Sequence, residues 1–137
     1  MGQGRNAIFL AQQGWEVTGF DPSAVGVQQA LAAAHRLKLH LETSVAREED
    51  FDCGRQRWDL IVMTYVRRLN TADSLRLQQA LKPGGILVYE NNNIGDLNET
   101  LRAFLGYRIL RFEDVDAHSD WHPEKQQRVE RMICQRP

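Results

Sequence analysis

Residues 2–23, GQGRNAIFLAQQGWEVTGFDPS, decide the fold class because they join a glycine-rich turn, a helix and a strand that ends on an acidic residue. Gly2 and Gly4 lack side chains, so a ligand can approach the backbone closely where the helix begins. Apolar residues recur at helical spacing from Arg5 to Gln13. Asp21 follows a β-branched, apolar run, at the end of a strand where open α/β sheets bind ligands. The stretch therefore predicts a nucleotide site in an α/β protein.

Helical and strand-like segments alternate along most of the chain, which predicts parallel strands joined by right-handed crossovers. Ser23 is a candidate N-cap for a helix that runs to about His35. Residues 57–66, RWDLIVMTYV, and 81–90, LKPGGILVYE, contain apolar runs typical of strands buried on both faces. The other expected elements are strands over 15–20 and 37–45, helices over 71–81 and 96–105, and strands over 107–115 and 128–135.

The last two expected strands follow each other without a helix between them. YRILRFEDV at residues 107–115 and RVERMICQ at residues 128–135 therefore predict an antiparallel hairpin. The expected architecture is a Rossmann-like α/β sandwich, with a mostly parallel sheet that ends in this hairpin. With 137 residues and no composition boundary, we expect residues 1–137 to form one domain.

Charge and cysteine usage narrow the range of partners. The formal net charge is −1, and the charged residues are spread along the chain without a long basic run. We therefore expect neither nucleic acid nor a membrane surface as a partner. Cys53 and Cys134 are far apart and form no Cys-x-x-Cys pair, so neither a zinc site nor a disulfide framework is indicated. A reducing cytoplasm suits two such cysteines.

One polar segment carries possible metal ligands at alternate positions, which would place them on one side of an extended chain. Asp116, His118, Asp120 and His122 recur at every second position. The segment lies in the link between the last two strands, far in sequence from the glycine-rich turn. We interpret it as a solvated connection, with Trp121 packed on the sheet, and predict no metal site.

Taken together, residues 2–23, 57–66 and 81–90 resemble the class I methyltransferases that use S-adenosylmethionine. Within that family, the sequence is most similar to small bacterial enzymes of the tellurite-resistance and thiopurine methyltransferase type. The resemblance covers essentially the whole chain. LKPGG before a buried strand, followed by a helix and a hairpin, is far more specific than the glycines. The resemblance implies a cytoplasmic transferase that carries out methylation.

The resemblance also implies roles for individual residues. Gly2 and Gly4 match the glycines that pass under the methionine part of the cofactor, and Asp21 matches the residue that holds its ribose. The position that contacts adenine is Arg47 or Glu48, depending on the alignment, and we take Glu48. The full set implied to bind the cofactor is Gly2, Gly4, Asp21, Pro22, Ser23, Glu48 and Thr64.

The acceptor pocket is expected at the carboxyl edge of the sheet. Tyr65, Glu90 and the run Asn91–Asn93 lie there and are candidates to line it. No catalytic residue is assigned. The stretch MTYVRR at residues 63–68 lacks both the Pro-Pro-aromatic motif of nucleic-acid amino methylation and the cysteine of cytosine-carbon methylation. Together with the balanced charge, this favours a small-molecule acceptor.

The resemblance predicts that the chain is truncated inside its glycine-rich motif. Family members read roughly Asp-x-Gly-x-Gly-x-Gly after an apolar first strand, and Met1 falls between the first two glycines. We therefore expect the central strand, between the strands ending at Asp21 and near Tyr65, to be missing. Unpaired strand edges would then leave the chain unstable or self-associating. Two alternatives stay open: a fragment of an NAD(P)-dependent oxidoreductase and a non-catalytic methyltransferase remnant.

Overall fold

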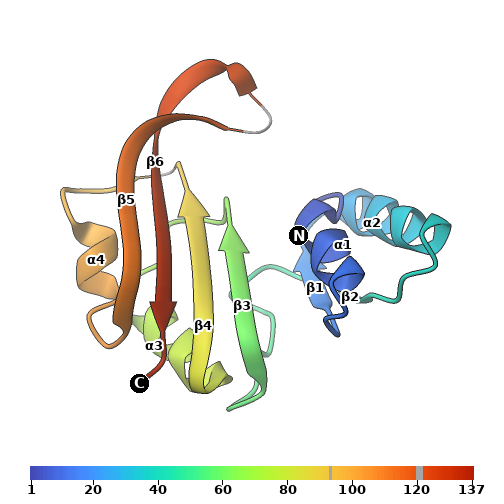
Figure 1. Cartoon of the computed structure of the whole chain (residues 1–137), viewed down its shortest axis with the longest axis horizontal. Coiled ribbons are helices and arrows are strands. Elements are labelled where there is room, and N and C mark those ends of the chain that lie inside the picture. The colour runs from blue at the N-terminus through green and yellow to red at the C-terminus, as the bar shows by residue number, and fades with distance from the viewer. Residues whose placement is uncertain (93, 120–121) are drawn as a thin grey trace. The chain divides into compact units, whose positions relative to one another are not determined.

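The computed structural model describes residues 1–92, 94–119 and 122–137 (Figure 1). The contacts divide the chain into two compact units, Met1–Asp52 and Cys53–Pro137. Among the described residues, no helix combines the length and apolar character needed to cross a lipid bilayer.

The first unit contains two helices and a two-stranded parallel sheet (blue to cyan in Figure 1). The two strands pair from Thr18 opposite Glu42 to Asp21 opposite Val45. The elements are α1 (Arg5–Gln12), β1 (Thr18–Asp21), α2 (Ala24–Arg36) and β2 (Glu42–Val45).

Small side chains let the two helices of this unit approach closely. Ser23 caps α2, its hydroxyl oxygen accepting a hydrogen bond from the Gly26 amide at 3.2 Å. Ala30 is fully buried on the α2 face that meets Gly4, at the start of α1. The buried cluster of the unit consists of Ala7, Ala34 and Leu41.

The second unit is a four-stranded mixed sheet in the order β3-β4-β6-β5. β3 and β4 are parallel, whereas β6 runs antiparallel to both β4 and β5. The predicted C-terminal hairpin is thus confirmed. The elements are β3 (Trp58–Thr64), α3 (Thr71–Ala80), β4 (Leu81–Asn91), α4 (Glu99–Ala103), β5 (Arg108–Ser119) and β6 (His122–Gln135).

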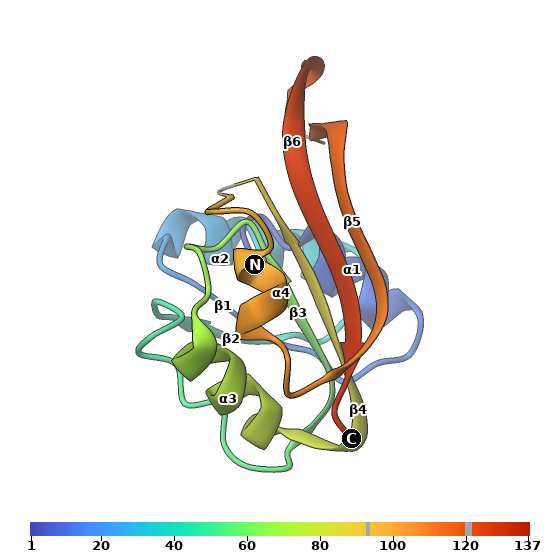
Figure 2. The ribbon, with the colours of Figure 1, turned by 90° about the vertical axis from the view of Figure 1, so that its left-hand side faces the viewer.

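Helices α3 and α4 cover one face of this sheet (Figure 2). On β4, Tyr89 packs against Phe104, which follows α4, with ring centroids 6.0 Å apart. The Tyr107 hydroxyl donates to the Ser74 carbonyl of α3 at 2.9 Å. Asn70 and Asp73 form a reciprocal capping box that starts α3. The aromatic rings of Tyr89, Phe104 and Tyr107 thus pack in the core of the second unit, and the capping box fixes the start of α3 beside it.

Several predicted elements are shorter in the structure. The strand expected over 37–45 is wrong over its first half, because Leu37 and Lys38 complete the C-terminal turn of α2. The Lys38 amide donates to the His35 carbonyl at 3.0 Å, and Lys38 has a left-handed φ of 57°. The helix expected over 96–105 shrinks to α4, which starts after Asn98, another left-handed residue.

The strands of the two units form separate sheets. Within the described ranges, no strand pairs with both β1 and β3, so each of these strands lies at the edge of its own sheet. The class expected from the sequence, α/β with parallel strands and a terminal antiparallel hairpin, is confirmed. The larger sheet is mixed because the hairpin contributes two of its four strands.

Candidate functional site

In the first unit, the glycine-rich turn lies against the carboxyl end of β1. The Gly2 amide donates to Asp21 Oδ2 at 2.7 Å, and the Ser23 amide donates to Oδ1 at 2.9 Å. The Met1 ammonium also contacts Oδ2, at 3.0 Å. The turn before α1 and the turn before α2 therefore converge on one carboxylate.

The surroundings of Asp21 keep it ionised. Partial burial by itself raises the pKa, but the hydrogen bonds from the Gly2 and Ser23 amides and the contact with the ammonium outweigh it, so the pKa of Asp21 is lowered. A carboxylate has about four lone-pair sites. Three of these sites are engaged by the Met1 ammonium and the Gly2 and Ser23 amides, so Asp21 retains capacity for about one further hydrogen bond from a ligand hydroxyl.

The two glycines of the turn differ in their surroundings. Gly4 has a φ of 86°, and a Cβ there would lie 2.6 Å from the Cβ of Ala30. Gly2 has a φ of 53°, and a Cβ there would meet no heavy atom within 4 Å. Gly4 is thus required by helix packing, while Gly2 borders open space beside Asp21. The residues present fit a ligand that lies along the backbone at Gly2.

The remaining first-unit candidates surround the ends of β1 and β2. Pro22 is exposed, and the Ser23 side chain is engaged as the cap of α2. Of the two residues considered for the adenine position, Glu48 is buried, with 8% exposure. Arg47 is largely exposed and lies 3.9 Å from Glu49 in an ion pair.

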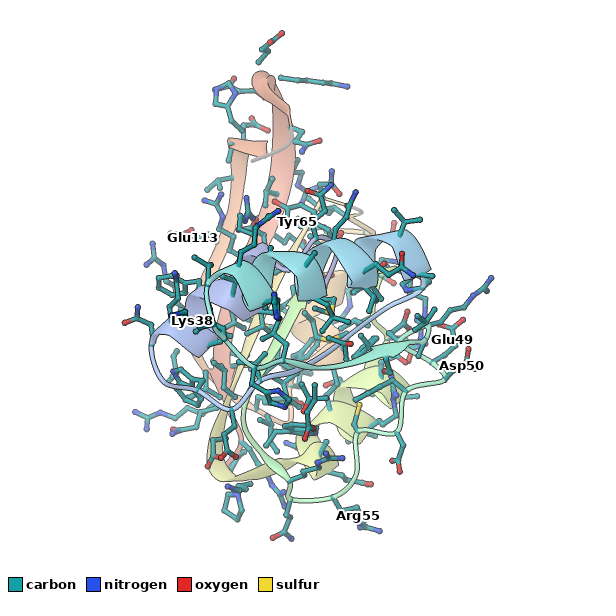
Figure 3. All side chains as sticks on the ribbon, turned by 90° about the vertical axis from the view of Figure 1, so that its right-hand side faces the viewer. Lys38, Glu49, Asp50, Arg55, Tyr65 and Glu113 are labelled. Carbon is teal, nitrogen blue, oxygen red and sulfur yellow. The ribbon has the colours of Figure 1, made fainter. Side chains whose placement is uncertain are left out.

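In the second unit, the candidate residues at the end of β3 contact β4. Thr64 is paired with Glu90 across the strands, and the Tyr65 amide donates to the Glu90 carbonyl at 2.8 Å. The Tyr65 hydroxyl donates to Glu90 Oε1. Tyr65, labelled in Figure 3, has a left-handed φ of 54°, which is uncommon for an aromatic residue.

The asparagine run does not point in one direction. Asn91 is 1% exposed, and its Nδ2 donates to the Val66 carbonyl at 2.8 Å and the Tyr89 hydroxyl at 3.2 Å. It thus holds the connection that follows β3. Asn92 is exposed and donates to Gln127 Oε1 at 3.1 Å. Asn93 lies outside the described residues.

Sequence reasoning missed Arg131, whose Nε donates to Glu90 Oε2 at 2.7 Å. The two residues are 41 positions apart, and the register of β6 on β4 places them opposite each other. Arg131 lies in the expected hairpin strand over 128–135, but no pattern in the sequence specified this register.

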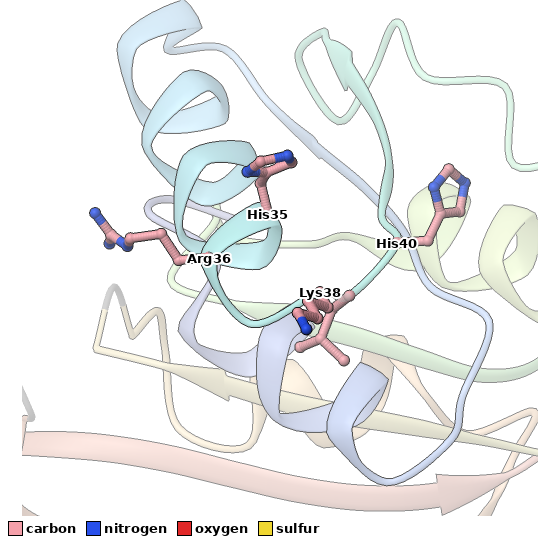
Figure 4. A pocket seen from close by; sticks show the side chains of 5 residues that line it. His35, Arg36, Lys38 and His40 are labelled. Carbon is pink, nitrogen blue, oxygen red and sulfur yellow. The ribbon is translucent and has the colours of Figure 1, made fainter.

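A surface hollow lies at the C-terminal end of α2. It is lined by His35, Arg36, Lys38, Leu39 and His40. Its labelled histidine, arginine and lysine side chains point in different directions (Figure 4), so they do not converge on a common ligand position. Among the residues that the structure describes, no group of three or more His, Cys, Asp or Glu side chains is arranged to hold a metal. Asp120 and Trp121, considered in the sequence, lie outside those residues.

The family described as "Methyltransferase domain" matches residues 1–85. That match covers both the glycine-rich turn with Asp21 and the strand that ends before Tyr65. No curated protein sequence matches the chain.

Three solved structures show the same fold at low sequence identity. TehB from Haemophilus influenzae has a TM-score of 0.80 at 14% identity, covering 99% of this chain and 55% of that chain. An S-adenosylmethionine-dependent methyltransferase from Mesorhizobium loti has a TM-score of 0.80 at 17% identity, covering 98% and 87%. The N-methyltransferase NodS from Bradyrhizobium japonicum, in complex with S-adenosyl-L-homocysteine, has a TM-score of 0.74 at 16% identity, covering 98% and 74%. The chain thus spans about half the length of TehB.

Proposed function

The chain belongs to the methyltransferase domain family, and from this premise we propose that it transfers a methyl group from S-adenosylmethionine to a small-molecule acceptor. The observation that carries the proposal is the ionised Asp21 carboxylate, held against an open backbone at Gly2. The structural relatives include proteins named for this cofactor and one bound to its demethylated product. The family match favours methyl transfer over the NAD(P)-dependent alternative.

In this proposal, Asp21 accepts a hydrogen bond from a ribose hydroxyl while the methionine part lies along the backbone at Gly2. Gly4 contributes by letting α1 start close to α2. Pro22 and Ser23 shape the turn beside the adenosine, and the buried carboxyl of Glu48 is the adenine-side candidate. Thr64, the last residue of β3, is the remaining residue of the proposed cofactor set.

The cofactor supplies a methyl group already activated by its sulfonium charge. The protein then has mainly to hold donor and acceptor close and aligned for in-line transfer. We assign the acceptor side to Tyr65 and Glu90, whose side chains contact each other at the end of β3 and β4. Asn91 supports this region from within the fold, through its bond to the connection after β3.

The proposal includes the setting in which the protein works. We propose that residues 1–137 act as one methyltransferase domain, in the cytoplasm, with neither nucleic acid nor membrane as a partner. The two cysteines are unbridged and buried, as expected of a reducing compartment. We also propose that copies associate through strand edges, because β3 is an apolar edge strand in its sheet.

The test is calorimetric titration of the full chain with S-adenosylhomocysteine and, separately, with NADH. We expect binding of S-adenosylhomocysteine only, with at least a tenfold loss of affinity in Asp21→Ala. The matched control is Asp59→Ala, which removes an exposed carboxylate that pairs with Lys82 in the second unit. Equal affinity in Asp21→Ala and wild type would reject the site.

Transfer of radiolabelled methyl groups to a panel of thiols, amines and hydroxyl compounds then separates an enzyme from a remnant. Labelled product establishes the activity. Binding of S-adenosylhomocysteine without transfer to any member of the panel would support the non-catalytic remnant instead.

A further inference from the structure

A row of alternating charges crosses the second-unit sheet beside the proposed acceptor side. The strand register places Thr64, Glu90, Arg131 and Glu113 opposite one another on β3, β4, β6 and β5. Arg131 donates to Glu90 at 2.7 Å and lies 3.9 Å from Glu113. The row continues to Arg111, whose Nε donates to Glu113 at 3.0 Å.

This row lies on the sheet face that α3 and α4 do not cover. Along β4, the neighbour Tyr89 packs against Phe104 on the helix side. On β6, the neighbour Glu130 is buried and accepts a hydrogen bond from Thr100 of α4. Because successive side chains alternate between faces, Glu90 and Arg131 point to the opposite face. The charged row is therefore separate from the core of this unit.

Both carboxylate oxygens of Glu90 are engaged by protein groups. Oε1 accepts from the Tyr65 hydroxyl, and Oε2 accepts from Arg131. Glu90 is thus arranged to orient the phenol, and Arg131 to orient Glu90. The Arg131 guanidinium also compensates the charge of the Glu90 carboxylate.

We propose that Arg131 is a positioning residue for methyl transfer, which aligns the Tyr65 hydroxyl through Glu90. This inference rests on the proposed function only in assigning Tyr65 to the acceptor side. The Tyr65 hydroxyl donates its proton to Glu90, so the Tyr65 oxygen can only accept a hydrogen bond from a bound substrate. The group that receives the methyl must therefore donate a hydrogen bond if it contacts this oxygen. The arrangement therefore suits acceptors that carry an N–H, O–H or S–H group.

The test follows Tyr65 itself, by fluorine NMR of the full chain labelled with 3-fluorotyrosine. The chain has three tyrosines, and the variant Tyr65→Phe assigns the Tyr65 signal. We expect Arg131→Met to move this signal by more than its linewidth. Arg131→Lys keeps the charge but loses the forked geometry, so the Tyr65 signal should lie between its wild-type position and its position in Arg131→Met.

A double substitution shows whether Arg131 acts through Glu90. In the Glu90→Gln background, Arg131→Met should produce no further movement of the Tyr65 signal. Arg128→Met is the matched control, because Arg128 lies on β6 like Arg131 but forms its exposed ion pair with Asp114 of β5. It should leave the signal in place.

Two outcomes overturn the inference: an unmoved Tyr65 signal in Arg131→Met, or an equal shift with and without Glu90. Retained Tyr89 and Tyr107 signals show that the second unit is folded. If Arg131→Met unfolds it, Arg131→Lys decides, since it leaves a cation beside Glu90 without the forked geometry, and an unmoved signal would reject the role. Because no cofactor is added, a failure of S-adenosylhomocysteine binding is a separate result that counts against the proposed function alone.

Discussion

At the scale of single residues, Gly2 and Gly4 belong to one motif but differ in the physical reason that each position holds a glycine. Both have left-handed backbones, and the sequence predicts room for a ligand at both. The structure places a helix against Gly4 and open space beside Gly2. The need for glycine at both positions was predictable from the motif. The difference between them depends on Ala30, whose approach only the packing of α2 determines.

Substituting Gly4 should destabilise the first unit more than substituting Gly14. Both glycines have a φ of 86°, but a Cβ at Gly14 meets nothing within 4 Å. Gly14→Ala should therefore cost only the left-handed strain, roughly 1–2 kcal/mol. Gly4→Ala adds the clash with Ala30, and amide hydrogen exchange in α1 and α2 should be faster than in Gly14→Ala. Equal exchange in the two variants would contradict the packing role.

Asp21 should make the turns of the first unit sensitive to acid. Its pKa is lowered in the folded state, so it contributes stability above the ordinary carboxyl pKa of about 3.9. That contribution is lost as the pH falls through the lower, folded value. The NMR signals of the Gly2 and Ser23 amides, which donate to Asp21, should titrate with a midpoint below about 3.9. A midpoint at or above that value, or the same titration in Asp21→Asn, would count against this assignment.

At the scale of elements, strongly patterned segments were predictable and their ends were not. The helix from Arg5, the cap at Ser23 and the apolar strand after Arg57 all appear where local chemistry indicates. The alternation of Leu37 and Leu39 suggested a strand, yet the backbone there closes α2. The Leu39 amide donates to the Ala34 carbonyl at 3.0 Å, so a helix-end bond overrides a period-two pattern.

Cys134, on the central strand β6, should report the opening of the second unit. It is fully buried, and burial raises the pKa of its thiol to about 12. In Cys53→Ala, labelling by a thiol-reactive dye near neutral pH should therefore be slow and should accelerate with urea as the unit opens, because the thiolate is the reactive form. Rapid labelling in native buffer would contradict the buried position. The reciprocal variant, Cys134→Ala, measures Cys53 separately.

At the scale of the whole molecule, the family and the strand directions were predictable because they depend on motifs and on the alternation of elements. The Glu90–Arg131 contact was not, because it depends on the register between strands 41 residues apart. The strands β1 and β3 belong to two separate sheets in the structure.

The unpartnered β3 edge should make the chain associate with a second copy. Light scattering should show a mass that rises with concentration. Val62→Lys places a charge on β3 and should lower the association, because edge charges oppose strand pairing. Val115→Lys, on the other edge strand β5, is the control. If only the Val115 variant dissociates, the contact lies on the hairpin, and a constant monomer mass would reject edge pairing altogether.

The position of β6 beside β4 has a consequence for biosynthesis. Strand β4 pairs with β3 on one side at once, but its other neighbour follows about forty residues later, as in the pairing of Glu90 with Arg131. At roughly 5–20 residues per second on the ribosome, that delay lasts about 2–8 s. During it, the nascent chain exposes Leu87 and Tyr89 along an unfinished sheet. Chaperone dependence in the cell should therefore centre on this interval of translation.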